Sequence, residues 1–155
     1  MSSTRFDVRR VDWDHPAGVA LRAAQQAEIA ERYGTPDSEP GPKPSAADVT
    51  AFFIAFTADD VPVACGGLRR LTPTEAEVKR MYAAPGYRGT GASVAVLSAL
   101  EDFGRRAGWA RLVLETGTFQ PDAIRFYTRE GYLRIPRFGY YEHNAESVCF
   151  AKPLR

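Results

Sequence analysis

This chain has few cysteines, no long apolar run and no large excess of positive or negative charge. Only 2 of the 155 residues are cysteines, which excludes a disulfide-rich scaffold, and both lie in apolar stretches typical of buried, inert thiols. The 20 Lys and Arg residues against 19 Asp and Glu leave a net charge of +1, so bulk electrostatics predicts neither nucleic acid nor an anionic membrane as a partner. No apolar run approaches a membrane span and no leader-like start is present, so we expect a cytoplasmic protein.

The composition is otherwise that of an ordinary globular protein. Hydrophobic residues make up 45% of the chain and charged residues 25%. A chain of this length buries roughly two-thirds of its unfolded surface, which predicts a single domain over residues 1–155.

Alternating and helical patterns divide the chain into strands and helices. Apolar and polar residues alternate, or apolar ones run together, in seven expected strands: Phe6–Val11, Thr50–Thr57, Val61–Leu71, Ala76–Ala83, Ala110–Glu115, Tyr132–Ile135 and Ser147–Leu154. Helical spacing and end signals predict three helices: Asp14 and Pro16 to Gly34, Ser93–Ala107, and Pro121–Glu130. Two segments have neither pattern. The proline-rich Thr35–Asp48 could be a surface connection or one wall of an acceptor site. The aromatic loop Pro136–Ala145 could form a wall of the acceptor site or a subunit contact.

The strand expected over Ala76–Ala83 contains an irregularity. A regular strand alternates with a period of two, so it cannot place Val78, Met81 and Ala83 on one face. An extra residue near Lys79 and Arg80 would correct the phase, which predicts a β-bulge there. A bulge splays a strand from its neighbour and exposes backbone N–H and C=O groups in a cleft.

A glycine-rich turn follows this strand and precedes a helix. The turn consists of Arg88, Gly89, Thr90, Gly91, Ala92 and Ser93. The free N–H groups and positive dipole end of a helix attract phosphate, glycines let the anion approach, and an arginine adds a bidentate cation. Glycines after a strand also serve simply to reverse the chain. A P-loop is excluded because no Lys-Ser or Lys-Thr follows the last glycine.

The wider pattern resembles the GNAT superfamily of acyl-CoA-dependent N-acetyltransferases. The resemblance runs over about residues 61–154, through Glu77 to Ala92 and then Ala123-Ile124-Arg125-Phe126-Tyr127 at matching separation. It implies a mixed α/β fold with a mostly antiparallel central sheet and helices on both faces. It also implies acetyl-CoA as the donor, with its pyrophosphate on the glycine-rich turn and its pantetheine arm along the bulged strand at Met81, Tyr82 and Ala83.

The resemblance implies roles for three further residues. Tyr127 matches the family's tyrosine beside the thioester sulfur and is the candidate acid, although packing with Ile124 would also explain an aromatic there. Glu77 matches the glutamate that takes the amine proton in some members, with a salt bridge to Lys79 or Arg70 as its alternative. Gln120 stands where the family commonly has an asparagine that contacts the coenzyme arm, and Ser93 replaces a frequent glycine or alanine.

Three remaining features leave alternatives open. Glu115, at the end of its strand, could attract a cationic amine or cap the next turn. His143 has no second His or Cys at metal-ligand spacing, so we expect no metal. The resemblance thus implies transfer of an acetyl group from acetyl-CoA directly to an amine of a small molecule or peptide, and a homodimer is the assembly that we expect. The alternatives are a non-catalytic acetyl-CoA sensor that regulates a partner protein, and transfer of a longer acyl group.

Overall fold

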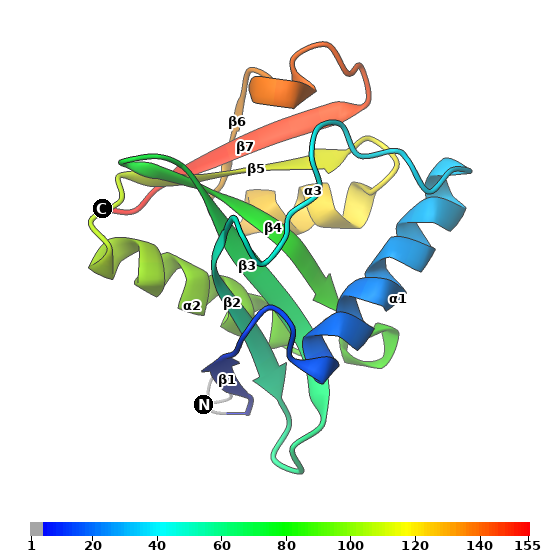
Figure 1. The fold of residues 1–155 in the computed structure, drawn as a ribbon, viewed down its shortest axis with the longest axis vertical. Coiled ribbons are helices and arrows are strands. Elements are labelled where there is room, and N and C mark those ends of the chain that lie inside the picture. The colour runs from blue at the N-terminus through cyan, green and yellow to red at the C-terminus, as the bar shows by residue number, and fades with distance from the viewer. Residues whose placement is uncertain (1–4) are drawn as a thin grey trace.

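The computed structural model describes residues 5–155 and forms one seven-stranded sheet with three α-helices (Figure 1). The strands are β1 (Asp7–Arg10), β2 (Val49–Phe56), β3 (Pro62–Thr72), β4 (Glu75–Ala83), β5 (Arg111–Gly117), β6 (Leu133–Ile135) and β7 (Ser147–Pro153). The helices are α1 (Pro16–Tyr33), α2 (Ala92–Arg106) and α3 (Pro121–Arg129), with short 3₁₀ turns η2 (Pro85–Tyr87) and η3 (Gly139–Tyr141). All ten elements expected from the sequence are present, with ends that coincide or differ by one or two residues.

The strands lie in the order β1-β2-β3-β4-β5-β7-β6, and only β4 and β5 run parallel to each other. This confirms the expected mixed α/β fold with a mostly antiparallel sheet. The β4–β5 pairing is short: it joins Glu75, Ala76 and Glu77 to Arg111, Leu112 and Val113 and then ends. Beyond that point the two strands diverge toward α1 and α3, which opens the sheet in its middle (Figure 1).

Helices cover both faces of the sheet, as expected. On one face, the buried side chains of α2 and the inner side of α3 pack in the main hydrophobic core. On the other face, α1 packs Leu21 with Phe52 and Ile54 of β2 in a second, smaller cluster. Gly18 makes this contact close, because a Cβ at that position would lie only 2.8 Å from the Phe52 ring.

The start of α1 corrects one detail of the sequence interpretation. Pro16 is indeed the first helical residue, but the N-cap is His15 and not Asp14. His15 Nδ1 accepts a hydrogen bond from the Ala17 amide at 3.1 Å, which satisfies one of the free N–H groups at the helix start. An imidazole nitrogen can replace the usual carboxylate or hydroxyl at a cap, and the residue type gave no hint of it. The helix ends at Gly34 with φ 73°, as the sequence predicts.

The predicted β-bulge in β4 is present. The register with β3 pairs Tyr82 with Cys65 and Lys79 with Gly67, so one extra residue of β4 lies opposite Gly66. Arg80 takes up the irregularity with a left-handed φ of 60°, an uncommon conformation for a side chain of this size. As a result Val78, Met81 and Ala83 all contact the main core on one face, while Glu77 and Lys79 point to the other.

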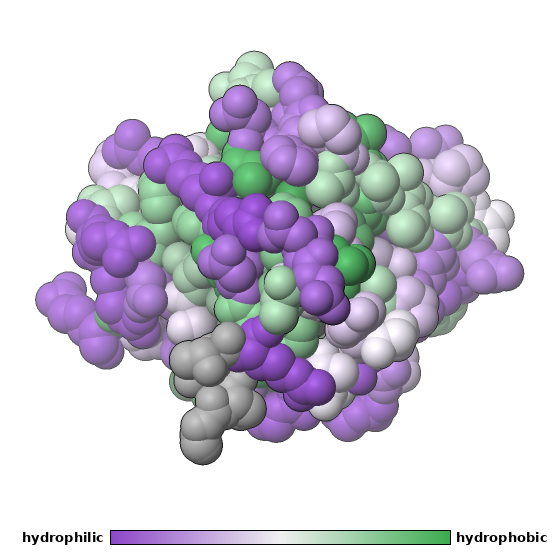
Figure 2. Space-filling view, turned by 90° about the horizontal axis from the view of Figure 1, so that it is seen from below, coloured by the Kyte–Doolittle hydropathy of each residue, from purple (hydrophilic) through white to green (hydrophobic). Residues whose placement is uncertain are grey.

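The irregular segment 35–48 and the surface complete the description of the fold. Residues 35–48 form neither helix nor strand, as their prolines predict, and run from α1 to β2. Figure 2 shows one face of the molecule, on which hydrophobic residues lie in small areas between hydrophilic ones. Within residues 5–155, no helix is long and apolar enough to cross a membrane.

Candidate active site

A cavity of about 570 Å³ lies between α1, the end of β4 and α3, and reaches the glycine-rich turn. This volume lies within the range of small-molecule and cofactor sites. Nine of the residues that the sequence pattern singled out as site residues line it: Met81, Tyr82, Ala83, Arg88, Gly89, Gly91, Ser93, Gln120 and Tyr127. Thr90 and Ala92 do not line it. The Thr90 hydroxyl donates to Tyr87 O within the turn, and the Ala92 side chain is buried in the core.

The glycine-rich turn has the geometry of an anion site. Gly89 and Gly91 have φ values of 77° and 95°, and a Cβ at either position would meet no heavy atom within 4 Å. Both glycines are therefore required by backbone conformation and border open space. The first intrahelical bond of α2 runs from Ala95 N to Gly91 O, so the amides of the first helical residues before it have no acceptor within the helix.

The Arg88 guanidinium stands at the same turn, but it has protein partners. Its Nε donates to Ala83 O at 3.0 Å, and its Nη2 lies 2.7 Å from Glu28 Oε1 of α1. Glu28 also pairs with Arg32 at 3.0 Å. The arginine is thus held at the cavity wall by a carboxylate that sequence reasoning did not identify.

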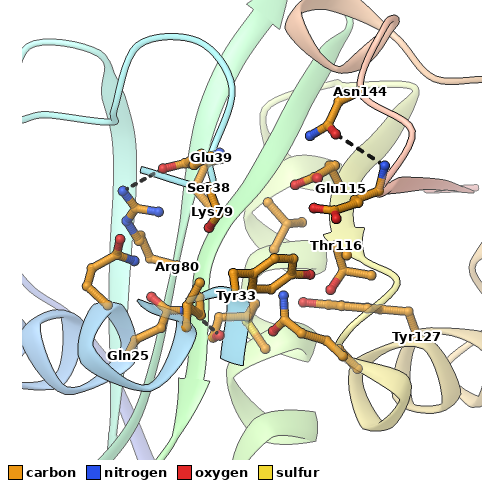
Figure 3. A pocket seen from close by; sticks show the side chains of 18 of the residues that line it. Gln25, Tyr33, Ser38, Glu39, Lys79, Arg80, Glu115, Thr116, Tyr127 and Asn144 are labelled. Carbon is orange, nitrogen blue, oxygen red and sulfur yellow. Dashed lines mark hydrogen bonds and ion pairs between the residues drawn. The ribbon is translucent and has the colours of Figure 1, made fainter. Parts of the chain in front are cut away.

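A second, smaller cavity of about 120 Å³ continues from the first toward α1 and the loop before β7. Figure 3 shows its two sides: Glu39, Lys79 and Arg80 lie on one, and Glu115, Thr116 and Tyr127 on the other. Several residues line both cavities and therefore mark their junction: Gln25, Ile29, Met81, Gln120, Ala123 and Tyr127.

Tyr127 combines burial with access to the junction. It is 7% exposed, and its ring packs edge-on against Phe126 and Tyr132. Burial raises the pKa of its phenol above the usual range, so the hydroxyl keeps its proton at neutral pH. The side chain therefore packs in the core and also lines the junction of the two cavities, while its role as the acid stays a prediction.

Glu77 lies outside both cavity linings and is only 2% exposed. Tyr141 donates a hydrogen bond to its Oε2 at 2.5 Å, and Arg69 Nη2 donates to its Oε1 at 3.2 Å. Lys79 Nζ is 3.6 Å from Oε2. The expected alternative, a salt bridge, is thus present, with Arg69 in place of Arg70 as one of its two cations.

Glu115 lines the smaller cavity beyond the last β4–β5 pair. Ser147 on β7 donates to its Oε2 at 2.7 Å, and no cation lies within ion-pair distance in the described part of the chain. Burial raises the pKa of the carboxyl from 4.5 to about 7; Glu39 and Glu77 add to the rise, while Ser147 and Lys79 oppose it. A carboxyl with its pKa raised this far can take up or release a proton near neutral pH.

The inner face of α1 supplies polar residues that sequence reasoning missed. Gln25 Nε2 donates to Met81 O at 2.8 Å, directly on the bulged strand, and its Oε1 is buried without a hydrogen-bond partner. Gln25, Glu28 and Arg32 follow Leu21 at helical spacing, where a helix that only packs on a sheet carries apolar residues. Polar residues on the helix face that should pack on the sheet were the signal in the sequence that this face also borders a site.

Comparisons with known proteins agree with this geometry. The family model described as the acetyltransferase (GNAT) family matches residues 19–132. This match covers well over half of the chain.

The chain belongs to the GNAT acetyltransferase family.

Three relatives illustrate the similarity. A protein named IAA acetyltransferase from Azospirillum brasilense is 34% identical over 105 residues, which cover 66% of this chain and 67% of that protein. A structure named as an acyl-CoA N-acyltransferase from Klebsiella pneumoniae superposes with a TM-score of 0.81 at 28% identity, covering 97% and 98% of the two chains. A GNAT acetyltransferase from Elizabethkingia anophelis with acetyl-CoA bound has a TM-score of 0.71 at 12% identity, covering 96% and 98%. The last likeness concerns the fold alone.

GNAT membership makes this protein an acetyltransferase, and the family's donor is acetyl-CoA. The residues present fit that donor. The larger cavity has unpaired helix amides, two open glycines and the Arg88 cation at one end, which suit a diphosphate. Its other end meets Tyr127.

Proposed function

We propose that this GNAT acetyltransferase moves an acetyl group from acetyl-CoA directly onto a primary amine, with Glu115 as the base and Tyr127 as the acid. The observation that supports it best is the junction of two cavities at Tyr127. One cavity leads to an anion-binding turn, and the other contains a carboxyl with a pKa near neutrality. A donor and an acceptor that enter from these two sides would meet beside the tyrosine.

The need for a base follows from the chemistry of amines. An alkylamine with a pKa of about 10.4 is neutral in roughly one molecule in 2,500 at pH 7, a cost of about 4.6 kcal/mol. The neutral nitrogen attacks the thioester carbonyl, so that a C–N bond forms and the C–S bond breaks. Glu115 takes the surplus proton of the amine, directly or through water, and Tyr127 gives its proton to the departing thiolate. Glu115 then releases its proton and Tyr127 regains one, so that the net products are the amide and the free thiol.

We favour Glu115 over Glu77 as the base because a base must reach the amine. Arg69 and Tyr141 each donate a hydrogen bond to one oxygen of the Glu77 carboxylate. Glu77 also does not line the smaller cavity, which we call the acceptor cavity because we propose that the amine binds there. We propose that Glu77 instead holds β3, β4 and η3 together through Arg69 and Tyr141. Direct attack is proposed because Cys65 and Cys149 are buried and line neither cavity, so an acyl-cysteine intermediate has no place to form.

The test is release of free thiol from acetyl-CoA in the presence of a panel of primary amines. The proposal predicts saturable thiol release that depends on the amine, with an N-acetylated product of matching yield. A reaction without amine corrects for hydrolysis of the thioester. Tight binding of acetyl-CoA with no transfer to any amine of a broad panel would favour the non-catalytic sensor. A homodimer and a cytoplasmic location stay predictions.

A further inference from the structure

The acceptor cavity contains an internal carboxylate that comes from outside the sheet and helices. Glu39 lies in the irregular segment 35–48 and lines the smaller cavity. Its Oε2 is 2.6 Å from Lys79 Nζ, and its Oε1 is 3.0 Å from Arg80 Nη2 (Figure 3). The Glu39 carboxylate thus bridges two cations that lie about 40 positions further along the chain.

The two cations are fixed in place by the fold. The Lys79 and Arg80 side chains are only 6% and 11% exposed, and Arg80 has the left-handed conformation of the β4 bulge. Lys79 Nζ also donates to the Tyr141 hydroxyl at 3.0 Å. Together they form a position for an anion on the β4 side of the cavity.

The charges show why an anion belongs at this position. Burial alone would raise the pKa of Glu39, but Lys79 and Arg80 outweigh it and hold that pKa below its usual value, so the carboxylate is ionised at neutral pH. Glu77 is the next nearest carboxylate, and it is shared with Arg69. Without Glu39, the nearly buried Lys79 and Arg80 would have only the Glu77 carboxylate nearby, which already pairs with Arg69. Leaving buried cations without enough negative charge costs free energy of folding.

We infer that Glu39 determines acceptor specificity: it occupies the anion position on Lys79 and Arg80, so the site takes amines that carry no carboxylate beside the reacting nitrogen. The inference rests on the proposed amine acceptor. A free amino acid would bring a second carboxylate to a filled position and meet repulsion from Glu39. Simple alkylamines, and amino groups whose neighbouring carboxyl is an amide as at a peptide N-terminus, avoid that repulsion.

The first experiment measures anion binding without any acetyl transfer. Butyrate, with the neutral butyramide as its control, is titrated into the wild type, Glu39→Ala and Asp37→Ala by ligand-observed NMR. Asp37 is the matched control because it is an exposed carboxylate two positions away in the same segment. We expect Glu39→Ala to bind butyrate about tenfold more tightly than the other two proteins, with butyramide unaffected. Equal butyrate affinity in all three proteins overturns the inference, whether or not the protein is an amine acetyltransferase.

The second experiment measures specificity in turnover. The ratio of kcat/KM for leucinamide to that for leucine is compared between the wild type and Glu39→Ala, which cancels the difference in amine basicity between the two acceptors. We expect the ratio to fall at least tenfold in Glu39→Ala and to stay unchanged in Asp37→Ala. Glu39→Gln keeps the shape of the side chain and should change the ratio in the same direction. A wild type that prefers leucine, or a ratio that does not respond to position 39, contradicts the inference.

Discussion

Replacing Glu115 with glutamine should make the protein more stable and much less active. The two effects have one origin, the buried position of the carboxyl at the acceptor cavity. Its pKa is raised from 4.5 to about 7, chiefly by burial. Such a shift is useful to a base and costly to the fold, and the two consequences can be measured independently.

The stability effect has a definite sign. Between pH 4.5 and pH 7 the unfolded chain releases the Glu115 proton and the folded chain keeps it, so wild-type stability falls as the pH rises through this window. The shift is worth at most about 3 kcal/mol above pH 7, at 1.36 kcal/mol for each pH unit. Glu115→Gln removes this cost. Urea unfolding should show the variant to be more stable by up to about 3 kcal/mol at pH 8, and by little at pH 4.

The activity effect appears in the pH dependence of kcat/KM. With an alkylamine acceptor, kcat/KM rises about tenfold per pH unit because more of the amine is neutral. Below pH 7 the wild type should show a steeper slope of about a hundredfold per unit, since Glu115 must also lose its proton. Glu115→Gln should keep only the tenfold slope, and its rate should fall by roughly 10²–10⁴.

Glu146→Gln is the matched control, because it removes an exposed carboxylate that lines the same cavity. We expect it to leave the slope change near pH 7 in place. The reasoning is refuted if Glu115→Gln retains both the wild-type rate and the steep acid limb. A stable variant with unaltered kinetics would mean that Glu115 is buried near the site without acting in it.

Two further predictions concern the other candidates. Tyr127→Phe should lower kcat by about tenfold or more and leave the dissociation constant of acetyl-CoA nearly unchanged, because the hydroxyl would act on the leaving thiolate and not in binding; unchanged kcat would remove Tyr127 from the mechanism. Glu77→Gln should lower the free energy of unfolding by about 3 kcal/mol, because it breaks a buried ion pair with Arg69, yet the slope change near pH 7 should persist. Loss of that slope change in Glu77→Gln would instead identify Glu77 as the base.

Local signals in the sequence were enough to predict the elements and the bulge. The phase of Val78, Met81 and Ala83 required an extra residue in β4, and a bulge at Arg80 supplies it. The glycine-rich turn could be predicted in the same way, and the φ values of 77° and 95° at Gly89 and Gly91 explain why glycine stands at these two positions. Such features depend on residues close together in the chain.

The chemistry of the acceptor cavity depends on residues that lie far apart in the sequence, and it could therefore not be predicted from the sequence alone. Glu115 acquires its raised pKa from burial and from its neighbours across the cavity, with Ser147 holding one oxygen. Glu39 looked like one polar residue of a proline-rich segment until the fold brought it to Lys79 and Arg80. Glu77 was chosen from its position in the pattern, whereas its partners Arg69 and Tyr141 became visible only in three dimensions.

Binding of acetyl-CoA at the start of α2 is the claim on which the rest of the account depends. Gly91→Val places a branched side chain where the diphosphate is proposed to lie, and Gly108→Val is its matched control. Gly108 also has a positive φ, 79°, and also borders open space, but it follows the opposite end of the same helix. Calorimetric titration with acetyl-CoA should show at least tenfold weaker binding for Gly91→Val and wild-type binding for Gly108→Val, with both proteins folded. A folded Gly91→Val protein that binds acetyl-CoA as tightly as the wild type would contradict the account.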